Sequence, residues 1–359
     1  MLKITCVIHS LSFGGMERVM SILANNFSER ENTIVSILLV GKERKISFDL
    51  DAKIVVYKPD FEFNNDTRIL STVKTIKFIR STIIKLEPDV ILSFGEYWNN
   101  LVLLSLLGLK HPIFISDRSQ PNKNIGKFQN VLRNFLYPKA TGYIAQTIKA
   151  SEIAIKNKWN SNITVIGNPI GKVLNQGSDK RENIILTVGR LITTKHIDEL
   201  IDIFRISNNI EWKLVIVGGN AKKLNLLEEY RKLVQELGLQ NQIQLIGTST
   251  NVKEYYSKAK IFAFTSSSEG FPNVIGEAMS FGLPIIAYDC TAGPSDLIQD
   301  GESGFLIEER DHKAYVEKLN RLIEEPELRN KLGEKSLEKI KDFDAESIGE
   351  KFFAFITKN

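Results

Sequence analysis

Apolar runs with the length of buried β-strands alternate with amphipathic helical patterns along nearly the whole chain. This alternation favours parallel sheets with helices on both faces, because each crossover between parallel strands contains a helix. The series of strands restarts after residue 183, so we predict an α/β protein with two Rossmann-like, doubly wound domains. Strands are expected over 3–9, 33–40, 53–57, 89–94, 112–117, 142–145 and 163–166, and again over 184–188, 213–217, 243–246, 260–264, 284–287 and 304–307.

The stretch between the two series has the composition of a linker. Gly167-Asn168-Pro169-Ile170-Gly171 is followed by a polar run over 175–183. Residues of these types favour turns and loops. We place the domain boundary near residue 168, with a first domain over 1–168 and a second over 169–342. A last amphipathic pattern over 343–359 predicts one more helix.

The composition is that of an ordinary globular protein. Of 359 residues, 43% are apolar and 25% are charged, which suits two domains with separate cores. Cys6 and Cys290 lie far apart in apolar runs, which favours reduced core residues over a disulfide. The four histidines show no metal-ligand spacing. No secretory signal is evident, and no apolar run approaches the roughly 18 residues of a membrane span, so we expect a cytoplasmic protein.

Charge is distributed unevenly between the two halves. Residues 1–168 hold 22 Lys and Arg against 14 Asp and Glu, a net charge of +8, whereas residues 169–359 hold 25 against 29, a net charge of −4. A basic first half suggests an anionic partner. No helix-turn-helix, zinc or RNA-recognition signature supports nucleic acid. Anionic lipid headgroups or an acceptor that carries phosphate fit better.

Two carboxylates flank the predicted start of a helix in the second half. Glu269 precedes Pro272-Asn273, which indicates the beginning of the helix, and Glu277 follows within its first turns. The backbone N–H groups between them belong to a helix N-terminus, where phosphate binds well. Two carboxylates that accept from hydroxyls, around a phosphate site, suit a nucleotide-sugar. One would bind the sugar and the other the ribose.

The segment Ser266-Ser-Ser-Glu-Gly-Phe-Pro-Asn-Val-Ile-Gly-Glu-Ala-Met-Ser-Phe-Gly-Leu-Pro284 resembles the family-4 retaining glycosyltransferases, which have the GT-B fold. These enzymes carry two Glu separated by seven residues, then Glu-Ala-Met and Gly-x-Pro. The resemblance implies two domains that face each other across a cleft, and a last helix that crosses back to the first domain. It also implies a nucleoside-diphosphate sugar as donor, retention of anomeric configuration by same-face attack, and no metal requirement.

Further residues of the second half match the donor site of that family. Gly189-Arg190-Leu-Ile-Thr-Thr-Lys195 follows a predicted strand, and Lys195 is expected to open a helix. Arg190 and Lys195 suit a diphosphate. We expect Arg190, Lys195 and Glu269 to act in catalysis. The donor is expected to contact these residues together with Gly14, Gly15, Gly189, Gly218, Gly247, Gly270, Phe271, Asn273, Val274 and Glu277.

The acceptor side is less clearly marked. Gly14 and Gly15 lie between the first strand and a helix, where backbone N–H groups can contact a phosphate or a hydroxyl. Many relatives carry a histidine after the fifth strand, but this chain has Asp117-Arg118 there. Arg118 could bind an acceptor phosphate and Asp117 could accept a proton, or the two could form a surface ion pair. Glu96 follows another strand, beside aromatic residues that could stack on sugars or pack against helices.

Basic amphipathic patterns over 67–86 and 123–139 could lie on an anionic membrane surface or simply cover a core. Two Asp-x-Asp matches, Asp49 with Asp51 and Asp342 with Asp344, do not follow long apolar strands. We therefore expect no bound metal and no other cofactor beyond the nucleotide-sugar itself.

Together these patterns predict a hexosyltransferase. We expect a hexose or N-acetylhexosamine to move from a nucleoside-diphosphate sugar to a glycan hydroxyl, with UDP as the family's commonest nucleotide. An undecaprenyl-diphosphate-linked glycan at the inner face of the cytoplasmic membrane would suit the basic first half. Two alternatives remain: a nucleotide-sugar epimerase of the same fold, which would convert the donor without an acceptor, and a binding subunit without activity.

Overall fold

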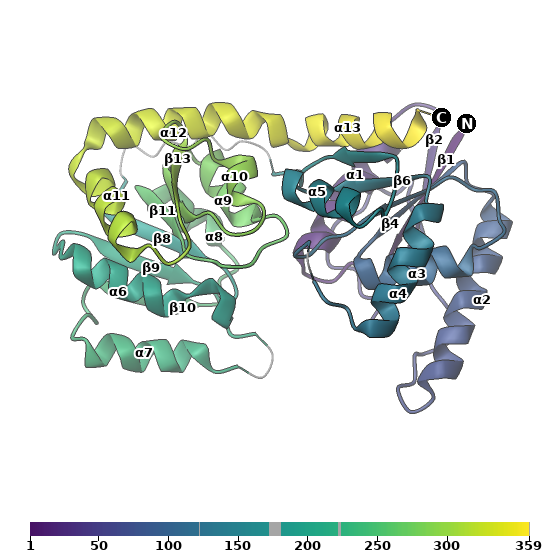
Figure 1. The fold of residues 1–359 in the computed structure, drawn as a ribbon, viewed down its shortest axis with the longest axis horizontal. Helices are drawn as coiled ribbons and strands as arrows, with labels where there is room; N and C mark the ends of the chain where they lie inside the picture. The colour runs from purple at the N-terminus through teal and green to yellow at the C-terminus, as the bar shows by residue number, and fades with distance from the viewer. Residues whose placement is uncertain (122, 172–180, 222–223, 359) are drawn as a thin grey trace. The chain divides into compact units, whose positions relative to one another are not determined.

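A computed structural model describes residues 1–121, 123–171, 181–221 and 224–358 (Figure 1). Residues 175–180 of the predicted polar linker lie outside this range. The chain forms two compact units, one from Met1–Pro169 with Ala345–Asn359 and the other from Ile170–Asp344. Each unit contains one sheet in which all the strand pairs are parallel.

The sheet of the first unit has seven strands in the order β3-β2-β1-β4-β5-β6-β7. Apolar, often β-branched residues dominate these segments, as buried parallel strands require. The order reverses between β1 and β4, which are neighbours in space but not in sequence. The strands are β1 (Leu2–Ile8), β2 (Thr33–Leu39), β3 (Val55–Tyr57), β4 (Val90–Phe94), β5 (Ile113–Ser116), β6 (Gly142–Ala145) and β7 (Ile163–Val165).

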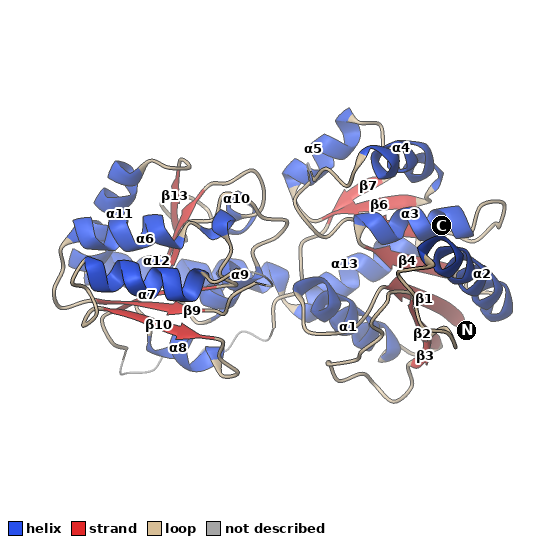
Figure 2. Ribbon diagram, turned by 90° about the horizontal axis from the view of Figure 1, so that it is seen from below, coloured by secondary structure: helices blue, strands red, loops and turns tan. Residues whose placement is uncertain are grey.

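Helices cover both faces of this sheet (Figure 2). One face packs against α2 (Arg68–Leu86), α3 (Glu96–Ser105), α4 (Lys127–Leu136) and α5 (Ile148–Lys156), and a short 3-10 helix, η1 (Tyr137–Lys139), follows α4. The other face packs against α1 (Gly15–Ser28) and the last helix, α13 (Ala345–Thr357). Phe94 in β4 packs against Phe352 of α13 with ring centroids 6.1 Å apart, a distance typical of aromatic pairs. The last helix therefore returns to the first unit, as the resemblance implied.

The second sheet has six strands in the order β10-β9-β8-β11-β12-β13, which is the doubly wound Rossmann order. The order reverses between β8 and β11. The strands are β8 (Ile184–Val188), β9 (Lys213–Val217), β10 (Ile243–Gly247), β11 (Ile261–Phe264), β12 (Ile285–Tyr288) and β13 (Gly304–Ile307). Each predicted strand of both sheets is present, with ends that differ from the expected ones by two residues at most.

Alternate residues of the second sheet face two separate cores, because successive side chains of a strand point to opposite faces. Ile185 and Ile216 face a core shared with α6 (Ile197–Ser207), α7 (Leu226–Glu236) and α11 (His312–Glu324). Leu186 and Val215 face a core shared with α8 (Val252–Lys258), α9 (Asn273–Ser280), α10 (Pro294–Leu297) and α12 (Pro326–Ile340). Two 3-10 helices, η2 (Thr193–Lys195) and η3 (Lys341–Phe343), complete the unit.

Both cysteines are buried and free, as the sequence predicted. Burial raises the pKa of each thiol to about 12, so neither is ionised at neutral pH. In the described part of the chain, no helix is both long and apolar enough to cross a membrane.

Close packing of α12 against the turn after α9 requires glycine at residue 333. A Cβ added at Gly333 would lie 2.3 Å from the carbonyl oxygen of Gly282, which belongs to the backbone and cannot rotate away. Helix propensity alone would make alanine more stable than glycine by about 1 kcal/mol. The contact reverses that preference.

We therefore predict that Gly333→Ala lowers the free energy of unfolding by about 1–3 kcal/mol through overpacking. Chemical denaturation measures this change. Glu334→Ala, at the next and exposed position of α12, is the matched control and should change stability little. A more stable Gly333→Ala protein would contradict the close contact.

Candidate functional site

The second unit places its candidate residues at the point where the strand order reverses. Chains that leave the carboxyl ends of β8 and β11 turn to opposite sides of the sheet, which opens a crevice between the loops that follow. The loop after β8 holds Gly189, Arg190 and Lys195, and the loop after β11 leads to Glu269. The sequence-predicted donor residues of this unit therefore gather at one edge of one sheet.

Three of the predicted glycines bring backbone segments together at this edge. A Cβ at Gly218 would lie 1.7 Å from the carbonyl oxygen of Gly189, so only glycine fits there. The backbone N–H of Gly218 donates to the carbonyl of Gly247 over 2.9 Å. Gly247 has a φ of +76° and ends β10 at an irregularity in its pairing with β9. The strand ends thus present backbone with few side chains, which lets a ligand approach closely.

Lys195 and Glu269 form an ion pair across the crevice. Lys195 Nζ lies 2.5 Å from Glu269 Oε1, and the two side chains are 16% and 14% exposed. The ammonium also lies 4.8 Å from the centre of the Phe264 ring, a cation–π distance. The pair is shielded enough to be held in place, yet it remains accessible from solvent.

The turn that carries Lys195 is fixed by the hydroxyl-rich segment after β11. Thr265 Oγ1 donates to the carbonyl of Lys195 over 2.9 Å, and Ser266 Oγ donates to that of Thr194 over 3.1 Å. We expected Lys195 to open a helix, which is wrong. Lys195 ends η2, and His196 adopts a left-handed conformation before α6 begins at Ile197. The side chain is therefore positioned by these hydrogen bonds and not by the first turn of a helix.

Polar side chains contact both ring nitrogens of His196. His196 Nε2 lies 2.7 Å from Ser267 Oγ, and its Nδ1 lies 3.1 Å from Glu199 Oε1. The second oxygen of Glu199 contacts His312 Nε2 at 3.0 Å and accepts from Tyr288 OH over 3.2 Å. Sequence reasoning missed these contacts, because Ser267, Tyr288 and His312 come from segments that are distant in sequence from α6.

Glu277 projects from α9, which begins at Asn273 as predicted. Its Oε2 accepts a hydrogen bond from Tyr256 OH over 3.1 Å. Tyr256 is 2% exposed and stacks on Phe281 with ring centroids 5.4 Å apart, so it holds the carboxylate firmly. Sequence reasoning missed Tyr256, which lies on α8 without any distinguishing motif.

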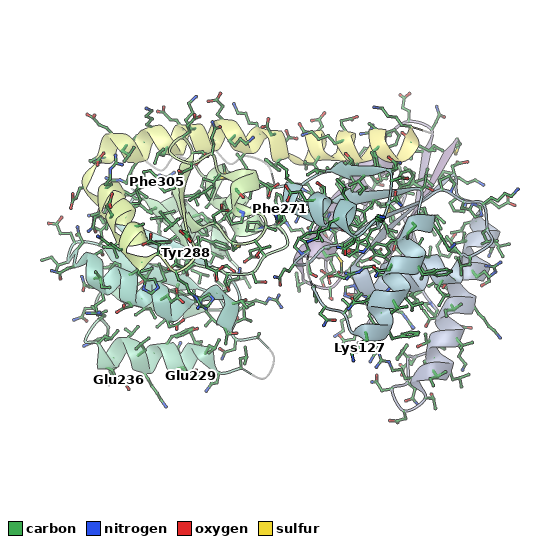
Figure 3. The ribbon with its side chains drawn as sticks, in the orientation of Figure 1. Lys127, Glu229, Glu236, Phe271, Tyr288 and Phe305 are labelled. Carbon is green, nitrogen blue, oxygen red and sulfur yellow. The ribbon has the colours of Figure 1, made fainter. Side chains whose placement is uncertain are left out.

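The loop before α9 contains the remaining donor candidates. Phe271, labelled in Figure 3, is buried in this loop. Its ring centroid lies 5.8 Å from that of Phe343. Gly270 precedes it in the loop, while Asn273 and Val274, both half-buried, form the first turn of α9. Arg190 is exposed directly after Gly189. These positions leave the N-terminal end of α9 and a guanidinium available on the same edge of the sheet as the ion pair.

In the first unit, Gly14 and Gly15 lie at the corresponding reversal point, after β1. Gly14 precedes α1, and a Cβ there would lie 2.2 Å from Glu17 Oε2. Glu17 Oε1 in turn lies 3.2 Å from His9 Nε2, and the His9 ring stacks on Trp98 with centroids 5.5 Å apart. The glycine turn is therefore backed by an imidazole, a carboxylate and an indole.

Asp117 and Arg118 do not form the surface ion pair that we considered. Asp117 is buried, and its Oδ1 accepts from Tyr137 OH over 2.6 Å and from Asn99 Nδ2 over 3.0 Å. Arg118 instead donates to Ser116 Oγ over 3.2 Å and to Asn168, and its guanidinium lies 4.4 Å from the centre of the Phe94 ring. The two side chains have separate partners.

The electrostatic environment of this cluster is unusual. Burial, and then the charge of nearby Glu96, raises the pKa of Asp117 to about 7. Burial lowers the pKa of Arg118 to about 9, so the guanidinium stays charged at neutral pH. Its buried Nε has no hydrogen-bond partner among the described residues. Glu96 is buried at the start of α3, where Ser119 Oγ donates to it and Lys123 Nζ lies 3.7 Å away.

Over the part of the chain that the structure describes, no group of three or more His, Cys, Asp or Glu residues could hold a metal ion, the contacts of Glu199 with two histidines included. The Asp-x-Asp segments are no exception. The absence of a metal requirement stays a prediction.

Comparisons with known proteins find similar glycosyltransferases. Residues 174–339 match the family model described as glycosyl transferases group 1. The chain is 28% identical to the amylovoran biosynthesis glycosyltransferase AmsD of Erwinia amylovora, over 98% of this chain and 99% of AmsD. It is 27% identical to a Campylobacter jejuni α-1,4-N-acetyl-D-galactosaminyltransferase named for a diphospho-undecaprenol glycan, over 100% and 99%.

Solved structures include glycosyltransferases with a similar fold. The lipopolysaccharide outer core galactosyltransferase WaaB, in its apo form, superposes with a TM-score of 0.80 at 22% identity, over 99% of both chains. At this identity the likeness concerns the fold, which is the two-domain GT-B architecture that the sequence predicted.

We predict that Asp117→Asn changes how stability depends on pH. A carboxyl whose pKa rises on folding stabilises the folded state below its unfolded pKa, and this contribution is lost as the pH rises through the folded value. As the pH rises from about 4 to about 7, the free energy of unfolding of the variant should therefore increase relative to that of the wild type. Above about pH 7 the difference between the two should stay constant. Unfolding temperatures across this range measure the effect. Asp60→Asn, at an exposed position, is the control, and a pH-independent difference for Asp117→Asn would contradict the raised pKa.

Proposed function

We infer that this chain, a glycosyltransferase whose second unit belongs to the glycosyl transferases group 1, transfers a hexose or N-acetylhexosamine from a nucleoside-diphosphate sugar to a hydroxyl of a glycan. The observation that carries the proposal is the ion pair of Lys195 and Glu269 at the reversal point of a Rossmann sheet, with Glu277 on the helix that follows. UDP is the proposed nucleotide, because it is the commonest in the family that the sequence resembles.

In the proposed complex, Glu277 accepts from the ribose hydroxyls. Glu277 is partly exposed, and the hydrogen bond from Tyr256 to Oε2 orients its carboxylate. Backbone at Gly218 and Gly247 lies at the same sheet edge, where backbone groups could contact a base. These contacts suit a nucleoside but do not select its base.

Lys195 would contact the diphosphate of the donor, and Glu269 would contact its sugar. Because their end groups are 2.5 Å apart, a diphosphate that approaches Lys195 brings its attached sugar within reach of Glu269. As the bond to the leaving diphosphate breaks, negative charge grows on that diphosphate. Lys195, Arg190 and the N-terminal end of α9 are fixed positive groups that can stabilise it without a metal.

The resemblance implies that the reaction retains anomeric configuration. In this mechanism the acceptor hydroxyl attacks from the face that the diphosphate leaves. Its proton passes to the leaving phosphate oxygen, so no side chain has to act as a nucleophile. Glu269 then serves to orient the sugar through its hydroxyls.

We propose a lipid-linked glycan as the acceptor, in bacterial polysaccharide assembly at the inner face of the cytoplasmic membrane. The name of the Campylobacter relative, which includes diphospho-undecaprenol, supports a lipid-linked acceptor. The net charge of +8 over residues 1–168 suits an anionic partner of this kind. Arg118 is the proposed contact to an acceptor phosphate, because its buried Nε has no partner among the described residues. Glu96 and Asp117 lie at the ends of the neighbouring strands β4 and β5.

Glu277→Ala should abolish thermal stabilisation by UDP. A ligand at 100 times its dissociation constant stabilises a protein by about 2.7 kcal/mol, and loss of the ribose carboxylate removes most of that binding. Melting curves with and without UDP measure the shift. Glu229→Ala, on the exposed face of α7, is the control. Equal shifts in the wild type and in Glu277→Ala would exclude the assigned role.

Lys195→Met should reduce kcat by about 100-fold or more, because it removes a charge that acts on the leaving diphosphate. The reaction of the wild type should continue in excess chelator. Transfer rates to a lipid-linked acceptor, with and without EDTA, test both statements. Loss of wild-type activity in EDTA would contradict the metal-independent mechanism, and an undiminished kcat in the variant would remove Lys195 from the chemistry.

A further inference from the structure

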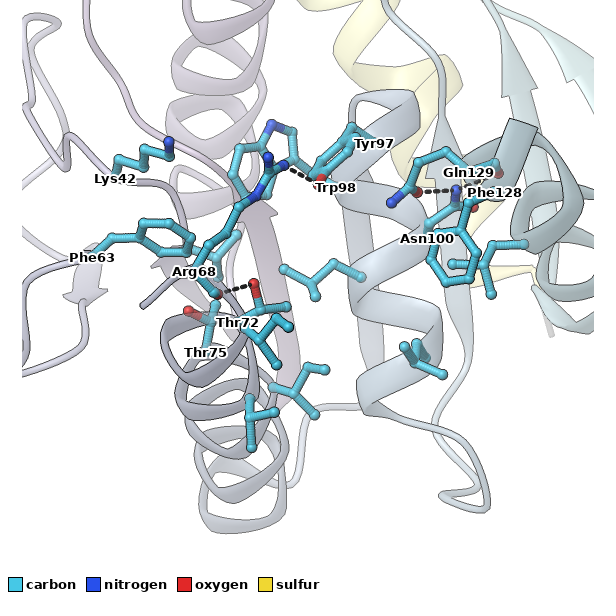
Figure 4. Close-up of a pocket in the computed structure, with 17 residues that line it drawn as sticks. Lys42, Phe63, Arg68, Thr72, Thr75, Tyr97, Trp98, Asn100, Phe128 and Gln129 are labelled. Carbon is cyan, nitrogen blue, oxygen red and sulfur yellow. Dashed lines mark hydrogen bonds between the residues drawn. The ribbon is translucent and has the colours of Figure 1, made fainter. Parts of the chain in front are cut away.

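An apolar groove opens between three helices of the first unit. It has a volume of about 430 Å³, within the roughly 300–1,000 Å³ of ordinary ligand pockets. Side chains of α2, α3 and α4 form its walls (Figure 4). The apolar groove is lined chiefly by Ile69, Val73, Ile76, Leu101, Leu104 and Leu132.

The groove is open because the N-terminal half of α2 leaves large apolar side chains uncovered. In its C-terminal half, Ile79 and Ile83 are buried, and Arg80 donates to the carbonyls of Ser105 and Leu107 over 3.0 and 2.9 Å. In its N-terminal half, Ile69 is 84% exposed. Phe128, on the opposite wall, is 72% exposed. Large apolar side chains at the mouth of an open groove suit an apolar ligand, because burial of their surface would stabilise the complex.

Positive charge is confined to one end of the groove. Of the described residues that line it, the charged ones are Lys42 and Arg68. Their contacts are with neutral groups, since Lys42 donates to the amide oxygen of Asn65 and Arg68 donates to Tyr97 OH over 3.0 Å. Figure 4 shows Lys42, Arg68 and Tyr97 near one another at this end. A ligand that fits both features has an anionic head and a hydrocarbon chain.

The charged end adjoins the carboxyl edge of the sheet. Lys42 follows β2 by three residues, and Tyr97 and Trp98 belong to the first turn of α3, directly after β4. Trp98 lines the groove on one side and stacks on His9 on the other. The anionic head would therefore lie beside the turn that holds Gly14 and Gly15, and the chain would extend away from the edge between α2 and α3.

We propose that the apolar groove binds the hydrocarbon chain of a polyisoprenyl-diphosphate-linked acceptor, with Lys42 and Arg68 beside its diphosphate. This inference rests on the proposed function, since it specifies the part of the acceptor that this chain recognises. It assigns the lipid to a defined site on the protein, in contrast to general adsorption on a membrane surface.

Farnesyl diphosphate is a water-soluble probe of this site, and inorganic diphosphate is the matching probe without the chain. Titrations are made by calorimetry on the full chain in saturating UDP, so that the donor site is already occupied. We expect farnesyl diphosphate to bind at least about tenfold more tightly than inorganic diphosphate, because only the former buries apolar surface. Equal affinities, or no binding of farnesyl diphosphate, would overturn the proposal.

Two pairs of variants locate the binding. Val73→Glu places a carboxylate in the groove, whereas Ile84→Glu places one on the same helix outside it, and the replaced side chains are 41% and 50% exposed. Val73→Glu should weaken farnesyl diphosphate binding by about tenfold or more, while Ile84→Glu should not change it. Arg68→Ala should also weaken it, in contrast to Lys77→Ala at an exposed position outside the groove.

Vesicles that contain anionic phospholipid provide the remaining comparison. If α2 only adsorbs to membranes, Val73→Glu and Ile84→Glu should weaken vesicle binding equally, and farnesyl diphosphate should not bind. That result would overturn the proposal. The UDP shift in melting temperature is measured on the same samples. If UDP raises the melting temperature but farnesyl diphosphate does not bind, the lipid site in the groove is rejected and the donor site is kept. If UDP causes no shift, the donor site and the proposed function are rejected.

Discussion

The close approach of backbone at the ends of β8, β9 and β10 is the constraint on which the candidate donor site depends. Gly218 leaves room for the carbonyl of Gly189, so the ends of β8 and β9 can lie close together at the reversal point of the sheet. The loop after β8 then reaches the segment after β11, whose hydroxyls hold the turn at Lys195. Without that approach the ammonium and Glu269 would not meet, because they lie 74 residues apart in sequence.

Much of this arrangement could be predicted because it is encoded locally. Each strand is a short apolar run, and Gly189, Gly218 and Gly247 lie at the ends of such runs. Lys195 and the two glutamates lie in the loops or the helix that follow β8 and β11. Parallel α/β folds bring the carboxyl ends of strands to one edge, so position in sequence translates into position at the site. The resemblance to known glycosyltransferases then supplied roles that the residue types alone left open.

The parts that could not be predicted depend on contacts between distant segments. Tyr256 binds Glu277 from another helix, and His196 is held by Ser267 and Glu199. The helix expected at Lys195 is displaced to Ile197 because tertiary hydrogen bonds favour a 3-10 turn there. Asp117 and Arg118, adjacent in sequence, have different partners. The apolar groove likewise depends on how α2, α3 and α4 are placed beside one another, which an amphipathic pattern cannot specify.

The central claim is that a nucleoside-diphosphate sugar donates its glycosyl group to a separate acceptor with retention. It is tested most directly by NMR of the reaction of α-linked UDP-sugars, labelled with ¹³C at the anomeric carbon, with a polyisoprenyl-diphosphate-linked glycan. We predict release of UDP only when acceptor is present, together with a new α-glycosidic signal on the acceptor. A β-linked product, or conversion of the donor to another nucleotide-sugar without acceptor, would contradict the claim.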